Sequence, residues 1–263
     1  MPEISEFYPI GRRAAVRRPS LFSESKAFFR KESGENMKIQ FLGHNAWSVT
    51  ASGYKILIDP FLSQNPAASC GPEDVEADFI LVSHGHGDHF GDTLEIAKRT
   101  GAAVLAIAEI AGYVNQHGVS NTLAMNLGGS AELPCGRVQM VPALHSSTLP
   151  DGTPGGNPAG FLLTLKEGKT LYFACDTALF GDMAILGKRG IDFAMLPIGD
   201  LFTMGPDDAL EAVKLLKPRC AIPCHFSTWP PIAQDPEAWK LRVESETDTA
   251  VRILTPGEML ETD

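Results

Sequence analysis

The sequence contains no long hydrophobic run, because its longest purely apolar stretch covers only residues 102–108. A membrane-spanning helix needs about 20 apolar residues. The N-terminus also lacks the basic stretch followed by an apolar one that marks a secretory signal. We therefore expect no membrane segment and no membrane partner.

Cysteine is scarce, with five residues in 263, and the number is odd. The five are scattered along the chain at Cys70, Cys135, Cys175, Cys220 and Cys224. This is not the pattern of a small disulfide-rich secreted domain. A reducing, cytoplasmic location is expected.

Positive charge is also in short supply, since 22 Lys and Arg face 32 Asp and Glu, for a net charge of −10. Proteins that bind nucleic acid usually present a basic field, so a small-molecule substrate is expected instead. The charge is uneven: residues 1–36 carry seven basic against five acidic side chains, and the remainder carries 15 against 27. We expect residues 1–36 to be a peripheral N-terminal extension, with a targeting segment or a true start at Met37 as alternatives. Residues 37–263 are expected to form the functional domain.

From Met37 onward, short apolar or alternating segments are separated by Gly and polar residues, a pattern that predicts strands. Longer amphipathic segments bounded by Gly or Pro predict helices. The expected helices are 92–101, 109–118, 205–218 and 236–245. The expected strands include 38–43, 46–51, 54–60, 78–83, 102–107, 138–145, a hairpin over 161–176, 192–199, 219–225 and 250–258. This order favours an α/β (α+β) fold of two mixed β-sheets packed face to face with helices on the outer faces, rather than one doubly wound sheet.

Histidine is rare as well, with seven residues in the chain, yet three of them lie in the segment FILVSHGHGDHF, residues 79–90. In an extended segment His84 and His86 point to the same side, because side chains alternate with a period of two. Gly85 and Gly87 permit an unusual backbone path between them. Asp88 and His89 would then face a second point nearby. The segment therefore predicts a metal-binding loop.

Other ligand-capable side chains also follow apolar strands. His145, Asp176 and His225 each stand at the carboxyl end of a predicted strand, as His84 does. Such strand ends meet at one edge of a sheet. The pool is too large for one tetrahedral ion and suits two, with one carboxylate shared. Imidazole and carboxylate ligands suit zinc, manganese, nickel or iron, and the lack of Cys in the loop disfavours a closed structural zinc site. Two divalent ions are expected, with zinc favoured.

These segments are similar to those of a known family. SHGHGDHFGD resembles the H-x-H-x-D-H signature of the metallo-β-lactamase superfamily. MKIQFLGHNAWSV, YKILIDPFLSQNP, PIGDLFTMGPDDAL and IPCHFSTWPPIAQDPEAW resemble the branch that contains the UPF0173 family and the L-ascorbate-6-phosphate lactonases. The resemblance covers residues 37–263 and implies a four-layer αβ/βα sandwich with a dinuclear metal site.

The resemblance also implies residue roles. Cys175 stands where this branch is expected to have Gly, which questions the backbone geometry next to Asp176. Carried over by position, seven metal ligands are implied: His84, His86 and His145 at the first metal, Asp88, His89 and His225 at the second, and Asp176 bridging the two.

The expected activity is metal-dependent hydrolysis of a small ester, lactone or phosphoester by a bridging hydroxide. Asp88 is expected to orient that hydroxide, and His44 is a candidate contact to the substrate. A phosphodiesterase or nuclease of the same superfamily is the main alternative, and a di-iron redox protein is a further one. Homo-oligomer formation is left open.

Overall fold

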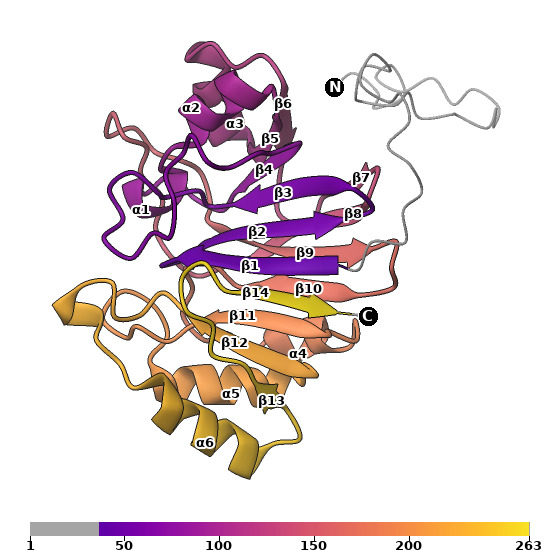
Figure 1. Cartoon of the computed structure of the whole chain (residues 1–263), viewed down its shortest axis with the longest axis vertical. Coiled ribbons are helices and arrows are strands. Elements are labelled where there is room, and N and C mark those ends of the chain that lie inside the picture. Colours follow the sequence, from indigo (N-terminus) through magenta and orange to yellow (C-terminus); the bar gives the residue numbers. More distant parts are fainter. Residues whose placement is uncertain (1–36, 263) are drawn as a thin grey trace, which may run out of the picture. The chain divides into compact units, whose positions relative to one another are not determined.

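Two seven-stranded β-sheets form the fold in a computed structural model that describes residues 37–262 (Figure 1). The first sheet has the order β14 (Met259–Thr262), β1 (Met37–Gly43), β2 (Ala46–Ala51), β3 (Tyr54–Ile58), β4 (Phe79–Val82), β5 (Ala103–Ile107) and β6 (Thr122–Met125). The second has the order β13 (Ala250–Val251), β12 (Cys220–Cys224), β11 (Phe193–Pro197), β10 (Thr170–Phe173), β9 (Ala159–Leu165), β8 (Gly136–Pro142) and β7 (Ser130–Leu133). The predicted extension at residues 1–36 lies outside the described residues.

Both sheets are mixed, as predicted, and they share one pattern. In the first sheet β14, β1, β2 and β3 pair antiparallel, and β3 to β6 pair parallel. In the second sheet β7 to β10 pair antiparallel, and β10 to β13 pair parallel. The parallel strands β4, β5 and β12 are buried along their length, which is why their sequences are continuously apolar rather than alternating.

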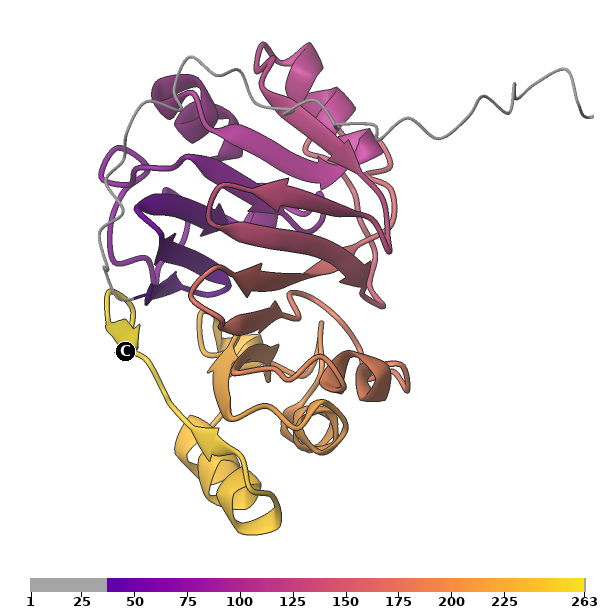
Figure 2. The same cartoon turned by 90° about the vertical axis from the view of Figure 1, so that its right-hand side faces the viewer.

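The sheets face one another and carry helices on their other faces, which confirms the predicted fold class. The ring of Trp47 in β2 lies 6.1 Å from that of Phe173 in β10, across the space between the sheets. The helices are α1 (Gly87–Phe90), α2 (Thr93–Thr100), α3 (Ala108–Gln116), α4 (Met183–Gly187), α5 (Pro206–Leu216) and α6 (Pro236–Glu246), with a 3₁₀ turn at Pro230–Ile232. Helices α2 and α3 pack on the first sheet at the top of Figures 1 and 2, and α5 and α6 lie at the bottom. Among the described residues, no helix is long and apolar enough to cross a membrane.

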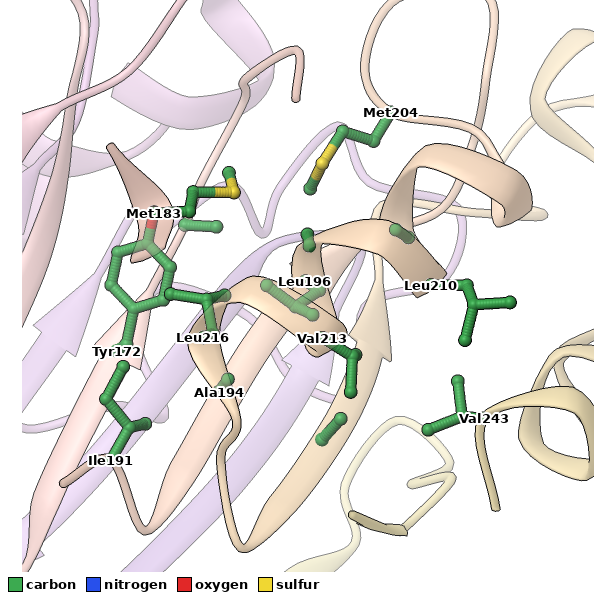
Figure 3. Packing of buried hydrophobic residues seen from close by; sticks show 14 of the residues in the cluster. Tyr172, Met183, Ile191, Ala194, Leu196, Met204, Leu210, Val213, Leu216 and Val243 are labelled. Carbon is green, nitrogen blue, oxygen red and sulfur yellow. The ribbon is translucent and has the colours of Figure 1, made fainter. Parts of the chain in front are cut away.

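Helix α5 shows how the sequence signals produce this layer. Pro206 opens the helix, and Asp207 and Asp208 occupy its first turn, where carboxylates are favoured. Its apolar residues Val213 and Leu216 lie over Leu196 of β11 in one buried cluster (Figure 3). That packing fixes the ends of β11 and β12 against the outer helix layer.

The prediction of a strand over residues 250–258 is wrong. Only Ala250 and Val251 pair, parallel to β12, and the chain then turns at residues 255–258. The next strand, β14, joins the first sheet by pairing antiparallel with β1. Gly257 at φ 93° makes the turn, because a left-handed backbone conformation favours glycine.

Candidate metal centre

The predicted site residues meet at one end of the two sheets. Three of them follow strands: His44 comes directly after β1, His225 directly after β12, and His84 after β4 with Ser83 between. Asp88 and His89 lie in the short helix α1, at the left of Figure 1. Polar side chains that come within ligand distance of one another form what we call the histidine–aspartate cluster: His44, His84, His86, Asp88, His89, His145, Asp176 and His225.

One part of the cluster is made of three imidazoles. A nitrogen from each of His84, His86 and His145 lies within 4.8 Å of the others. His84 Nε2 is 3.0 Å from His86 Nδ1, and Ser146 Oγ is 3.4 Å from His86 Nε2. Burial holds the pKa of His84 well below its usual value, so its imidazole is neutral at neutral pH and keeps a lone pair for a cation.

A second part combines a carboxylate with imidazoles. Asp88 Oδ2 lies 3.2 Å from His44 Nε2, 3.7 Å from His225 Nε2 and 3.9 Å from His89 Nε2. Burial opposes ionisation of Asp88, but the nearby imidazoles of His225 and His44 hold its pKa well below the ordinary value. The carboxylate is therefore charged at neutral pH.

Asp176 lies between the two parts. Its Oδ1 is 3.1 Å from His89 Nε2, while its Oδ2 is 3.2 Å from His225 Nε2 and 3.5 Å from His145 Nε2. Burial opposes ionisation here too, but His225 and His89 hold the pKa of Asp176 well below its usual range. One carboxylate thus faces histidines of both parts.

The cluster contains buried polar atoms without hydrogen-bond partners. They are His89 Nε2, Asp176 Oδ1 and both ring nitrogens of His225. Buried polar groups are normally paired, and these face one another as nitrogen and carboxylate donors of the kind that divalent cations take. Burial lowers the pKa of His225, but the nearby negative charge of Asp176 raises it to about 9. A cation would replace the ring proton that this pKa implies. The residues present fit a metal.

Strained backbone marks the strand ends around the cluster. Five non-glycine residues there adopt a positive φ: His44 (59°), Asp59 (46°), Cys175 (53°), Asp200 (69°) and His225 (51°). Side chains other than glycine pay about 1–3 kcal/mol for such conformations, which concentrate at functional sites. The positive φ of Cys175 explains why relatives are expected to have glycine at this position, because glycine takes this conformation without strain.

A buried aspartate supports the histidines from behind. Asp59 is fully buried and accepts hydrogen bonds from Ser83 N (2.8 Å), Ser83 Oγ (2.6 Å) and Asn45 Nδ2 (3.1 Å). Its Oδ2 is also 2.8 Å from His89 Nδ1. With Nδ1–H donated to Asp59, His89 Nε2 is left as the nitrogen that faces Asp88 and Asp176.

His44 is held in a similar way. Thr228 Oγ1 lies 2.8 Å from His44 Nδ1, and the His44 ring packs 4.8 Å from that of Trp229 and 4.0 Å from that of His225. Burial lowers the pKa of His44 to about 4. The neutral ring of His44 can donate a hydrogen bond from Nε2–H to Asp88 and accept one at Nδ1 from the Thr228 hydroxyl. Sequence reasoning missed Thr228 and Asn45, because no local pattern links residues that far apart in the chain.

The Gly/Pro-rich segment after β8 is hydrogen-bonded to the loop that carries His84 and His86. Gly85 N–H donates to Ser147 Oγ at 3.0 Å, and Gly155 N–H donates to the Ser147 carbonyl at 3.0 Å. A Cβ at Gly85 would lie 2.9 Å from the Thr148 backbone. Glycine is therefore required at this close approach between His84 and His86.

The cysteines lie outside this chemistry. Burial raises the pKa of the Cys135 and Cys220 thiols to about 11, and burial also raises the pKa of Cys175 and Cys224 well above the usual value. A thiol with a pKa of about 11 is a thiolate in about one molecule in a thousand at pH 8, and the thiolate is the reactive form.

We therefore expect iodoacetamide at pH 8 to add at most one group to the native protein, at the partly exposed Cys70. Intact mass spectrometry after timed labelling measures this, and the urea-unfolded protein, in which all five thiols should react, is the control. Two or more rapid adducts on the native protein would contradict it.

The arrangement of two facing mixed sheets with a His/Asp cluster at their strand ends defines a metallo-hydrolase of the β-lactamase type. In agreement, a beta-lactamase superfamily domain matches residues 54–226. A metallo-hydrolase structure from Ignicoccus hospitalis superposes with a TM-score of 0.79 and 37% identity, over 87% of this chain and 99% of that one.

Close sequence relatives narrow this class to one family. UPF0173 metal-dependent hydrolases of Thermococcus kodakarensis and Thermus thermophilus are 52% and 48% identical to this chain. Each alignment covers 86% of this chain, with 99% and 100% of the relative. The chain belongs to the UPF0173 family of metal-dependent hydrolases, as the sequence segments predicted.

Proposed function

We propose that residues 37–263 form a hydrolase domain whose cluster holds two divalent cations and cleaves a small ester, lactone or phosphoester. The observation that carries this is the position of Asp176, which faces His145 of one part of the cluster and His89 and His225 of the other. A single tetrahedral ion cannot use all eight side chains of the cluster, whereas two ions that share Asp176 can use most of them.

The proposed ligands divide between the two parts of the cluster. His84, His86 and His145 would hold one cation, and Asp88, His89 and His225 the other, with Asp176 shared. Imidazole with carboxylate favours zinc, with manganese, nickel or iron as alternatives. When bound, such ions lower the pKa of a coordinated water and polarise a substrate oxygen.

The protein's own groups orient the site. Asp59 fixes the ring of His89, and Ser83 Oγ lies 2.9 Å from His84 Nδ1. His44 holds Asp88 from the side of Trp229, so that Asp88 is placed to orient the attacking water. Asp88 is partly exposed, whereas Asp176 is buried, which gives Asp88 the access to incoming substrate.

The test combines elemental analysis with a substrate panel. The purified full chain is expected to contain about two equivalents of divalent metal and to hydrolyse a member of a panel of esters, lactones and phosphoesters. Chelation should abolish turnover, and added metal should restore it. Undiminished turnover by the metal-free protein would rule out the mechanism, and saturation at one equivalent would rule out the dinuclear site.

Replacement of Asp59 by Asn is expected to weaken metal binding about 10–100-fold, as loss of a partner behind a metal ligand usually does. An amide offers one acceptor atom where Asp59 now meets four donors, so the ring of His89 loses its fixed orientation. Competition with a chromophoric chelator measures the affinity. Asp74→Asn, an exposed change in the same loop, is the control, and equal affinity in both variants would contradict the prediction.

A further inference from the structure

Charge is segregated around the cluster. We define the rim loops as the segments at the cluster end of the sheets: residues 44–45, 59–70, 83–92, 143–158, 174–182, 198–205 and 225–235. Together they contain eight Asp and no Glu, Lys or Arg. The described part of the chain does have 15 Lys and Arg, and all of them lie elsewhere.

Several basic residues lie at the end of the sheets away from the cluster. Lys166 and Lys169 lie in the β9–β10 turn, and Lys217 and Arg219 immediately precede β12. Arg99 of α2 lies away from the cluster too, where Glu76 Oε1 at 3.0 Å and the Pro72 carbonyl at 2.8 Å engage it. It is not available to a ligand.

The rim also exposes large apolar side chains. Among the described residues six large hydrophobic side chains are exposed, and three of them are in rim loops: Leu144 (53%), Leu201 (65%) and Phe202 (55%). Backbone hydrogen bonds to Thr177 hold the loops of these side chains next to Asp176. The Leu144 N–H donates to Thr177 Oγ1 at 2.9 Å, and the Met204 N–H donates to the Thr177 carbonyl at 3.0 Å.

Aromatic rings extend the apolar character on the side of His44. The half-buried Trp229 lies 4.8 Å from His44 and 6.2 Å from Phe61, measured between ring centroids. The rim around the cluster thus combines apolar, aromatic, acidic and uncharged polar side chains and has no Lys or Arg.

Phosphate and carboxylate groups are normally recognised by Arg or Lys in paired hydrogen bonds. An acidic rim instead repels anions and lowers their local concentration. Resting on the hydrolase function proposed above, we propose that the substrate is an uncharged ester or lactone whose apolar part packs against Leu144, Leu201 and Phe202. Water adds to the carbonyl carbon, the acyl C–O bond breaks, and the leaving oxygen takes the proton, giving an acid and an alcohol. The rim offers no Lys or Arg to bind a phosphate, which disfavours phosphorylated metabolites and nucleic acids.

The test compares matched neutral and anionic substrates on the metal-loaded full chain. The neutral probes are 4-nitrophenyl butyrate and γ-lactones of increasing alkyl length, and the anionic ones are 4-nitrophenyl hemisuccinate and bis(4-nitrophenyl) phosphate. We expect kcat/KM to be at least about tenfold higher for the butyrate than for the hemisuccinate, and to rise with alkyl length, because apolar contact area favours binding. If the protein hydrolyses either anionic probe faster and still needs metal, the inference of an uncharged substrate is wrong and the proposed hydrolase function stands. Hydrolysis of no probe overturns the proposed function.

Charge substitutions then locate the effect. Leu201→Lys and Phe202→Lys are expected to raise the hemisuccinate-to-butyrate ratio of kcat/KM about tenfold, because a cation at the rim attracts the anion. Leu241→Lys, an equally exposed change on α6, is the control and should leave the ratio unchanged. Equal ratios in all three variants would overturn the inference. Sedimentation analysis adds a second outcome: if Leu201→Lys splits an oligomer and leaves the chain-length dependence unchanged, the apolar rim is a contact between copies of this chain and the proposal is wrong.

Discussion

Replacement of Asp176 by Asn is expected to lower kcat/KM more than about 100-fold, since loss of a supporting partner alone costs about 10–100-fold. The amide has no charge, and its NH₂ group would face histidine nitrogens where Asp176 now presents oxygens at 3.1–3.5 Å. Bound metal is expected to fall from about two equivalents to one or fewer. Elemental analysis of the purified variant and steady-state kinetics on the best panel substrate measure both effects.

The control for this change is Asp182→Asn, which makes the same substitution at an exposed position six residues along the chain. It should keep both the metal content and the rate. Circular dichroism of the metal-free proteins separates loss of the site from loss of the fold. Full metal content together with full activity in Asp176→Asn would show that this carboxylate is not a shared ligand.

The second large effect is expected from Trp47, which joins the two sheets. Its side chain is fully buried, with its ring 4.7 Å from Phe41 and 6.1 Å from Phe173 of the opposite sheet. Trp47→Ala should reduce the free energy of unfolding by about 3–5 kcal/mol, the usual cost of removing a large core side chain. Because whole domains are stable by only about 5–15 kcal/mol, this variant should be close to unfolding. Urea denaturation of the metal-free protein measures it.

Trp47→Phe is the matched control, and the structure gives it a specific expectation. The indole Nε1 is buried without a hydrogen-bond partner, so its removal sacrifices no hydrogen bond. The cost should be clearly smaller than for Trp47→Ala, because phenylalanine fills much of the space that alanine would leave empty. If Trp47→Phe is as destabilising as Trp47→Ala, the indole N–H has a partner and the packing explanation is wrong.

Much of the fold could be predicted because the signals are local. Gly101 ends α2 in a left-handed conformation, and Pro206 begins α5, both as their residue types indicate. The strand expected at residues 250–258 failed because Pro256 and Gly257 turn the chain into the other sheet. Apolar character alone does not say which sheet a segment joins. The four-residue strands β6 and β7 were missed because so few residues establish no period.

The meeting of the site residues could also be predicted, since each follows a strand and strand ends converge. Their ligand roles remain a proposal. What no local pattern could supply is the support around them. Thr228 reaches His44 from 184 positions away, and the left-handed backbone of Cys175 and His225 has no sequence marker in residues other than glycine. Contacts of that kind depend on the packed structure as a whole.

The pairing of β14 with β1 has a consequence for how the protein is made. The first strand of the described chain receives its outer neighbour from residues 259–262, after the whole second sheet has been synthesised. The cluster likewise combines His84 from the first sheet with His145 and His225 from the second. A growing chain on the ribosome therefore has an incomplete cluster until His225 emerges and an open β1 edge until residues 259–262 emerge. Contacts between such distant segments slow folding, and an uncovered strand edge invites aggregation. Assistance by a chaperone would be most useful during that interval.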